Sequence, residues 1–210
     1  MPYFKNNDVN LLFIHIPKTG GSSLECYFSN KFNIPLNEKS LFMYMNDEKK
    51  RQHNVNMESS LQHITYNQMI EYKDILSIDF NNIKIITIVR NPYERIISDL
   101  FFLQLITINS SKEETYKCIK NFIASTEYDN HTLPQHYFIT IDNELVPNIN
   151  LLKTETLTSD MIKLGYDDFN FVMLKNNYNL DYYTYLNSDS IQVINEFYHH
   201  DFILFNYKKI

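Results

Sequence analysis

Two apolar runs of strand length, each followed by a turn and a helical pattern, constrain the fold of this 210-residue chain most strongly. The first run covers residues 11–16 and stops at Pro17, and the second covers residues 83–89 and is followed by Arg90 and Pro92. Pro92 suits a first helical turn because its missing N–H is not needed there. Since buried strands that alternate with helices form parallel sheets, the sequence predicts an α/β fold with three layers, a central parallel sheet flanked by helices.

Weaker patterns complete the expected architecture. Further helices are expected within 61–80 and near 112–126, 157–164 and 188–199, with another strand near 170–174 and a C-terminal segment, 201–205, packed on the core. The polar residues 36–60 show no clear period, so we interpret them as an irregular excursion over the sheet and a possible lid. Without an internal repeat or a low-complexity linker, residues 1–210 are expected to form a single domain.

Charge and cysteine content narrow the function classes. A net charge of −6 argues against general nucleic-acid binding and against a basic groove for a long polyanion, although a local basic pocket is still possible. Cys26 and Cys118 are too few and too widely spaced for a disulfide framework or a compact metal site. No apolar run approaches the ~20 residues of a membrane span and no targeting segment is recognisable, so we expect a soluble, cytoplasmic protein with no membrane partner.

The turn after the first strand has the composition of an anion site. A strand that ends in a glycine turn and opens a helix directs free N–H groups and the helix dipole at one spot. Two of the three glycines of the chain are adjacent in this turn, where they permit close approach of the backbone. The candidate ligand-binding residues are Lys18, Thr19, Gly20, Gly21, Ser22 and Ser23.

A nucleotide triphosphatase loop is the first competing interpretation of this turn. In that loop the lysine follows the second glycine, whereas Lys18 precedes both Gly20 and Gly21. A kinase would also require Mg²⁺, and the dispersed carboxylates show no convincing metal site and no glycosidase pair. A Mg²⁺-dependent nucleotide or small-molecule kinase and a catalytically inactive nucleotide-binding relative remain the alternatives.

Two segments carry a family resemblance. Residues 13–23, FIHIPKTGGSS, resemble the 5′-phosphosulfate loop of the carbohydrate sulfotransferases related to the heparan sulfate 2-O and 6-O enzymes. Residues 88–98, IVRNPYERIIS, resemble the 3′-phosphate segment of the same family. The resemblance implies a P-loop-like version of the α/β fold and 3′-phosphoadenosine 5′-phosphosulfate (PAPS) as the donor, with no metal.

The resemblance also assigns roles to individual residues. It implies that Arg90 and Ser98 hold the 3′-phosphate, and the planar fork of an arginine is independently suited to bidentate phosphate binding. Arg95, one turn further along, fits an ordinary surface or ion-pairing arginine. Lys18 would stabilise the charge that builds on the departing phosphate oxygen.

The catalytic base is expected to be a histidine. Its pKa lies near operating pH, and in related enzymes the base is a His, or in other branches a Glu, between the two nucleotide segments, which leaves His53 and His63 here. The surroundings of His63 are more similar to those in the family. A His-x-x-Pro-Gln segment, His131 to Gln135, is also similar to the family and suggests that these two residues contact the acceptor or the donor.

The expected function is therefore transfer of the sulfuryl group of PAPS to a hydroxyl by in-line displacement. The resemblance implies a carbohydrate acceptor. Because the chain has only three arginines, Arg51, Arg90 and Arg95, little is available to grip a heavily sulfated polymer. A short or neutral glycan or another small hydroxylated acceptor is therefore equally plausible.

Overall fold

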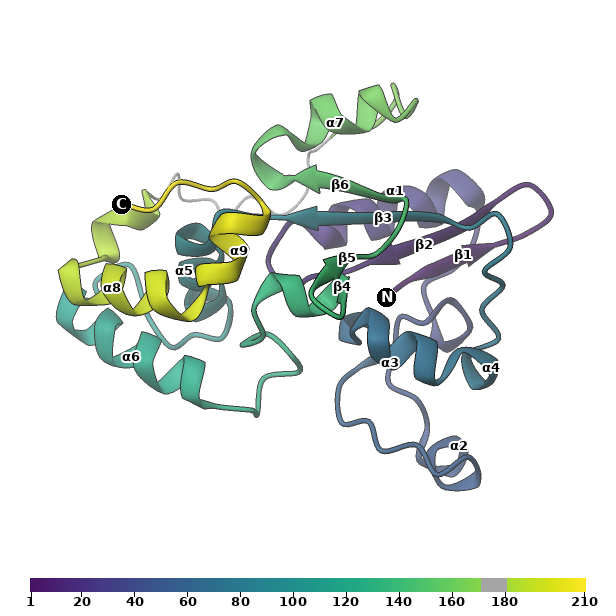
Figure 1. Cartoon of the computed structure of the whole chain (residues 1–210), viewed down its shortest axis with the longest axis horizontal. Coiled ribbons are helices and arrows are strands. Elements are labelled where there is room, and N and C mark those ends of the chain that lie inside the picture. Colours follow the sequence, from purple (N-terminus) through teal and green to yellow (C-terminus); the bar gives the residue numbers. More distant parts are fainter. Residues whose placement is uncertain (171–180) are drawn as a thin grey trace.

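The computed structural model describes residues 1–170 and 181–210. Its central sheet has the strand order β1-β2-β3-β6, formed by Tyr3–Lys5, Asn10–Ile14, Lys84–Val89 and Ile149–Lys153 (Figure 1). Strands β2, β3 and β6 run parallel, and β1 lies antiparallel at the edge. The predicted mixed α/β fold with a mostly parallel central sheet flanked by helices is confirmed.

The parallel register explains why both apolar runs are buried throughout. Leu12 of β2 lies opposite Ile85 of β3, and Ile88 of β3 lies opposite Leu152 of β6. Alternate side chains of these strands enter two separate apolar clusters, one on each face of the sheet. Burial on both faces requires the near-continuous apolar sequence of a parallel strand.

Helices cover both faces. On one face, α1 (Gly21–Phe32) and α7 (Leu157–Lys163) contribute Leu24, Phe28 and Met161 to the core. On the other face lie α3 (Tyr66–Glu71), α4 (Lys73–Leu76) and the short hairpin of β4 (Thr140–Ile141) and β5 (Glu144–Leu145). The 36–60 segment also packs on this face and contains α2 (Asp47–Gln52).

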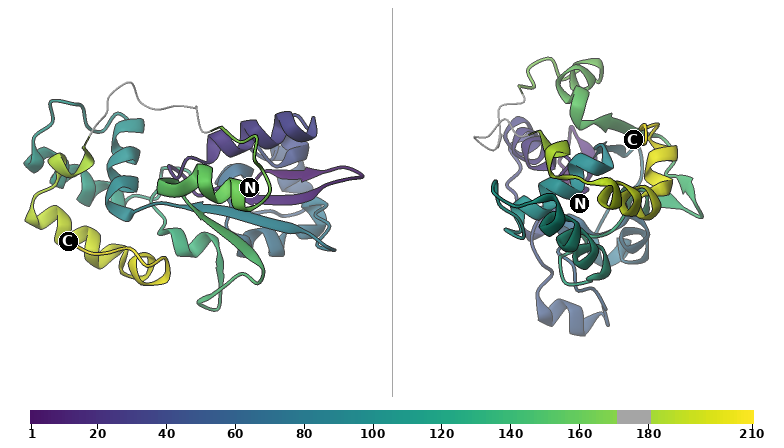
Figure 2. Two further views of the ribbon diagram at one scale, coloured as in Figure 1. Left: turned by 90° about the horizontal axis from the view of Figure 1, so that it is seen from above. Right: turned by 90° about the vertical axis from the view of Figure 1, so that its left-hand side faces the viewer.

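A group of helices lies beyond the carboxyl ends of the parallel strands (Figures 1 and 2). Its members share a third apolar cluster. They are α5 (Pro92–Phe102), α6 (Lys112–Ala124), α8 (Ser188–Phe197) and α9 (His199–Leu204). The helices predicted in these regions are confirmed, and Phe202 and Phe205 bury the C-terminal segment as expected.

The structure differs from the sequence-based expectations in two places. The edge strand β1 and the β4–β5 hairpin were not predicted, because both are too short to show a period. The strand expected near 170–174 falls almost entirely outside the described residues. Of the described helices, none is long and apolar enough to cross a membrane.

Candidate active site

The loop between β2 and α1 has the backbone geometry of an anion-binding turn. Lys18 and Gly20 both adopt positive φ, 65° and 91°, and Gly20 precedes α1 without a side-chain cap on its first amides. The buried hydroxyl of Thr19 donates to the Ile16 carbonyl at 2.8 Å and closes the loop. Thr154, which follows β6, donates to the Thr19 carbonyl at 2.6 Å and secures the loop from the neighbouring strand.

Position 21 requires glycine because the His15 ring occupies the space of a side chain there. A Cβ atom built on Gly21 would lie 2.4 Å from both Cδ2 and Nε2 of the His15 ring, which real side chains do not tolerate. The ring is held in this place by Glu25, whose Oε1 lies 2.5 Å from His15 Nδ1. Both carboxylate oxygens of Glu25 also accept from Nε2 of Gln62, at 2.8 and 2.9 Å. The buried His15–Glu25 pair therefore joins the loop, α1 and the segment that carries His63.

Lys18 extends from the loop over the end of α5. Its Nζ lies 3.9 Å from the ring centroid of Phe102, a cation–π contact. Burial lowers the pKa of the Lys18 ammonium; the nearby Asp99 charge opposes this shift, and the Arg90 charge adds to it. The lysine is thus half-buried in a site with charges of both signs nearby.

Arg90 follows β3 and lies against the same loop. Its Nη1 donates to the Lys18 carbonyl at 3.2 Å, and its Nη2 to Glu94 at 3.2 Å. The guanidinium lies 5.1 Å from the ring centroid of Tyr182. Within the described residues the buried Nε has no hydrogen-bond partner. Such an unsatisfied donor is costly to bury, so the Arg90 fork has unused capacity for an anionic ligand.

Arg95 corrects one expectation. It is 1% exposed, not a surface residue, and its guanidinium donates to three backbone carbonyls. These belong to Pro17, Leu133 and His131, at 3.0, 2.9 and 2.8 Å. Arg95 therefore ties the loop after β2 to the His131 segment.

Three histidine rings, those of His15, His63 and His131, contact one another in sequence beside the loop, and we call them the histidine row. The His63 ring packs edge-to-face with both His15 and His131, each at 5.1 Å between centroids. Each of the three rings contacts its own carboxylate through Nδ1. The pairs are His15 with Glu25, His63 with Asp129 at 2.8 Å, and His131 with Asp99 at 2.6 Å.

The pKa of His63 departs strongly from its usual value. Burial lowers the pKa of His63 to about 4, against the opposing effect of the Asp129 hydrogen bond. For Asp129, burial acts to raise the pKa, but hydrogen bonds from His63 and Ser60 outweigh it and leave the pKa lowered. His63 is therefore neutral and Asp129 ionised at neutral pH.

The structure brings most of the candidate residues together. Arg90 contacts the Lys18 carbonyl, and Phe102, which contacts Lys18, stacks on His131 with ring planes 3° apart. Ser98 is buried on α5, two turns after Arg90 and next to Asp99. Ser22 and Ser23 begin α1, where Ser23 is buried and Ser22 is half-buried. His53, the other candidate base, is exposed at the end of α2.

Gln135 lies one step behind the ligand site. It is fully buried, and its amide bonds the backbone of Arg90 in both directions. This places Gln135 as a support for Arg90, and its contact with an acceptor or donor stays a prediction.

The sequence analysis missed the carboxylates that hold the histidines. Glu25, Asp99 and Asp129 come from α1, α5 and a loop, with 10, 32 and 66 positions between each acid and its histidine. No spacing rule identifies such pairs. The only available signal was adjacency, since Asp99 follows Ser98 and Asp129 lies two residues before His131.

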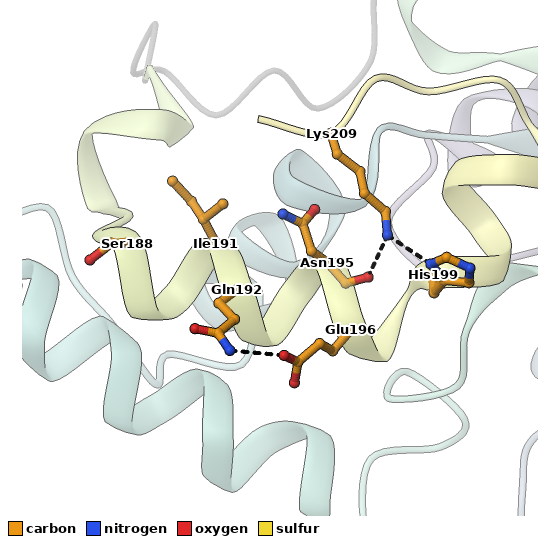
Figure 3. Close-up of a pocket in the computed structure, with 7 residues that line it drawn as sticks. All are labelled: Ser188, Ile191, Gln192, Asn195, Glu196, His199 and Lys209. Carbon is orange, nitrogen blue, oxygen red and sulfur yellow. Dashed lines mark hydrogen bonds between the residues drawn. The ribbon is translucent and has the colours of Figure 1, made fainter.

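Two hollows lie on the described surface outside the histidine row. One, of about 570 Å³, follows α8 and the C-terminal segment, where Lys209 contacts the Asn195 carbonyl and His199 (Figure 3). It contains none of the candidate residues. The other, of about 340 Å³, is lined by residues 154–159, next to the Thr154 bond to the loop. No cluster of His, Cys, Asp and Glu that could hold a metal occurs among the described residues.

These features define a class of protein: an α/β protein with a cationic glycine turn suited to an anion at the carboxyl edge of its parallel strands, and with histidine–carboxylate pairs beside that turn. The chain belongs to the sulfotransferase family, whose model matches residues 1–208. It is accordingly a sulfotransferase, an enzyme of sulfuryl transfer. Comparisons with curated proteins and with solved structures found no match.

Proposed function

We propose that this sulfotransferase uses PAPS as its donor and transfers the sulfuryl group to a hydroxyl of a carbohydrate or of another small acceptor. The observation that carries the proposal is a contact between residues 13–23 and residues 88–98, the two segments that resemble nucleotide-binding segments of the family. Arg90 donates to the carbonyl of Lys18, so a cation suited to the 3′-phosphate lies against the loop suited to the 5′-phosphosulfate.

The residues present fit such a donor. The uncapped start of α1 and the glycine pair offer backbone amides to one phosphate group. Among the described residues, the buried Nε of Arg90 has no acceptor. Ser98 supplies a hydroxyl on α5, about two turns after Arg90. We assign Lys18, Thr19, Gly20, Gly21, Ser22 and Ser23 to the 5′ side and Arg90 and Ser98 to the 3′ side.

Two residues are proposed to act in the transfer itself. Lys18 would stabilise the negative charge that develops on the departing phosphate oxygen as the S–O bond breaks. His63, neutral at physiological pH, would take the proton of the acceptor hydroxyl as its oxygen bonds to sulfur. The histidine row supports this role, because His63 lies between His15, which packs on the loop, and His131.

Exposed aromatic side chains support an acceptor with apolar ring faces. Phe102 is 59% exposed and contacts both Lys18 and His131. Tyr44, from the 36–60 segment, is 56% exposed, and the carbonyl of the preceding Met43 accepts from the amide of Leu61, two residues before His63, at 3.1 Å. Sugar rings pack on such surfaces. We therefore assign the acceptor to this side, with the 36–60 segment as its lid in a single domain of residues 1–210.

Calorimetric binding tests the donor assignment. Titrations would compare 3′-phosphoadenosine 5′-phosphate, the product nucleotide, with ADP and with ATP plus Mg²⁺. Wild type should prefer the 3′-phosphorylated nucleotide without metal, and Arg90→Ala should lose that preference. Arg51→Ala, which removes an exposed arginine of α2, is the matched control and should bind like wild type. Tighter, metal-dependent ATP binding would support a kinase, and no binding of any of these nucleotides would overturn the donor assignment.

A further inference from the structure

Two adjacent loop residues hold His63 from two directions. Asp129 contacts Nδ1 of the His63 ring through Oδ2 at 2.8 Å, and Asn130 donates its side-chain amide to the His63 carbonyl, also at 2.8 Å. Both residues adopt positive φ, 46° and 63°, a conformation that Asp and Asn tolerate better than most residues. The turn therefore fixes both the ring and the backbone of His63.

The Asp129 carboxylate is itself anchored. The backbone amide of Ser60 donates to Oδ1 at 2.6 Å, and the Ser60 hydroxyl donates to Oδ2 at 2.8 Å. With the His63 contact, the carboxylate takes part in three hydrogen bonds to the 60–63 segment. An ionised carboxylate only accepts hydrogen bonds, so the proton between the two groups belongs to Nδ1 of His63.

The neighbouring histidines do not compete for Asp129. His15 and His131 both contact the His63 ring, but each uses its Nδ1 on a different carboxylate, Glu25 or Asp99. His63 is thus kept in one orientation by its own acid and by two rings that are themselves fixed. Because Nδ1 of His63 carries the proton, Nε2 is the ring nitrogen that can accept another.

We propose that Asp129 is a positioning residue for sulfuryl transfer: it fixes the tautomer and orientation of His63 so that Nε2 receives the acceptor proton. The inference rests on the proposed function, in which His63 is the base. As the acceptor O–H bond breaks, its proton and a positive charge pass to the imidazole, and the ionised Asp129 stabilises that charge. The role is the same as that of an acid behind a histidine base in other hydroxyl-activating sites.

Asp129→Asn tests the proposal, because the amide keeps the size of the carboxylate but loses its charge. Turnover of PAPS with a hydroxylated acceptor should fall about 10²-fold or more in kcat. Binding of 3′-phosphoadenosine 5′-phosphate should be unchanged, since that ligand is assigned to the loop and Arg90. The matched control is Asp142→Asn, an exposed aspartate that also has positive φ, 50°, in the β4–β5 turn. It should retain wild-type kcat.

The pH profile gives a readout that loss of packing would not produce. The groups that face His63 are Asp129, His15 and His131. Asp129 is the one whose charge favours protonated His63, so its removal should move the acid limb of kcat to lower pH. If Asp129→Asn does not fold, Asp129→Glu replaces it; its longer side chain should lower kcat while the acid limb stays in place.

A double variant separates action through His63 from any other effect. In a His63→Gln background, Asp129→Asn should cause no further loss, because the group it positions is gone. Wild-type kcat in Asp129→Asn, or an equal loss with and without His63, would overturn the inference and leave the donor assignment standing. If wild type binds no 3′-phosphorylated nucleotide and transfers no sulfuryl group, the proposed function itself fails.

Discussion

The side-chain amide of Gln135 pairs with the backbone of Arg90 in both directions. Gln135 Oε1 accepts from the Arg90 amide at 2.9 Å, and Gln135 Nε2 donates to the Arg90 carbonyl at 2.8 Å. The backbone N–H of Gln135 donates to the buried carboxylate of Asp201 at 2.8 Å. Gln135 thus fixes the backbone at the end of β3, and Asp201 of α9 fixes Gln135.

Gln135→Ala should destabilise the protein and weaken nucleotide binding. The substitution leaves the Arg90 amide and carbonyl without their partners, which costs about 1–3 kcal/mol in unfolding free energy. Urea unfolding and calorimetry would measure the two effects. Gln192→Ala, which removes an exposed glutamine bonded to Glu196 on α8, serves as the control and should change neither. Unchanged nucleotide affinity in Gln135→Ala would show that Arg90 does not depend on this support.

Gly21→Ala should lower nucleotide affinity by at least about tenfold. The added methyl would overlap the His15 ring, and the displacement of either group costs about 1–3 kcal/mol. Gly165→Ala is the control, because it adds the same methyl group at a glycine that contacts no side chain there. Gly165 has a φ of 86° and open space around it, so alanine there should cost roughly 1 kcal/mol of stability through backbone strain. It should leave binding intact.

The buried His63 makes stability depend on pH. Its pKa is about 4 in the folded protein and about 6.5 when unfolded. The unfolded chain therefore binds more protons between these values, so this contribution is fully present above pH 6.5 and is lost as pH falls toward 4. The loss amounts to about 3 kcal/mol. Urea unfolding at several pH values should show a flatter curve for His63→Gln, and parallel curves would contradict the assignment.

Arg95→Lys should destabilise the protein by about 3 kcal/mol although it keeps the charge. A lysine ammonium cannot reach three carbonyls that a planar guanidinium bonds at once. Thermal unfolding would measure the effect. The exposed arginine of α2 provides the comparison, and Arg51→Lys should melt like wild type. Equal melting temperatures for the two variants would exclude a structural role for the Arg95 fork.

Phe102→Leu should raise the KM for the acceptor several-fold and leave donor binding unchanged. Leucine keeps an apolar side chain but removes the flat ring on which an acceptor ring would pack. Steady-state kinetics with varied acceptor would measure this. Tyr137 is also exposed, but its ring contacts His136 and not the histidine row. Tyr137→Leu is therefore the control and should leave the acceptor KM unchanged. An unchanged acceptor KM in Phe102→Leu would move the acceptor site elsewhere.

The sequence predicted those parts of the fold that rest on local pattern. The two apolar runs became β2 and β3 because each is buried on both faces, and the glycine turn and Pro92 marked the starts of α1 and α5. The β1 strand has only three residues and forms through pairing with β2, so its sequence carries no period of its own.

The sequence predicted candidate ligand-binding and histidine residues, but not the buried groups that hold them in place. Lys18 and Arg90 could be found because the chemistry of an anion demands cations beside a glycine turn. The acids behind the histidines could not, since Glu25 and Asp129 are brought to their partners by tertiary packing alone. Arg95 was misjudged for the same reason: a guanidinium is buried only where several carbonyls converge, and convergence is invisible along the chain.

The three bonds of Arg95 also bear on how the protein opens locally. One side chain holds the loop before Lys18 and two carbonyls of the His131 segment. Movement of either segment therefore removes an acceptor from the one guanidinium that both segments share. In native-state hydrogen exchange, the amides of both should be protected by a common opening free energy. A common opening would order or disorder the proposed donor and acceptor sides of the site at the same time. Neither side would then form without the other.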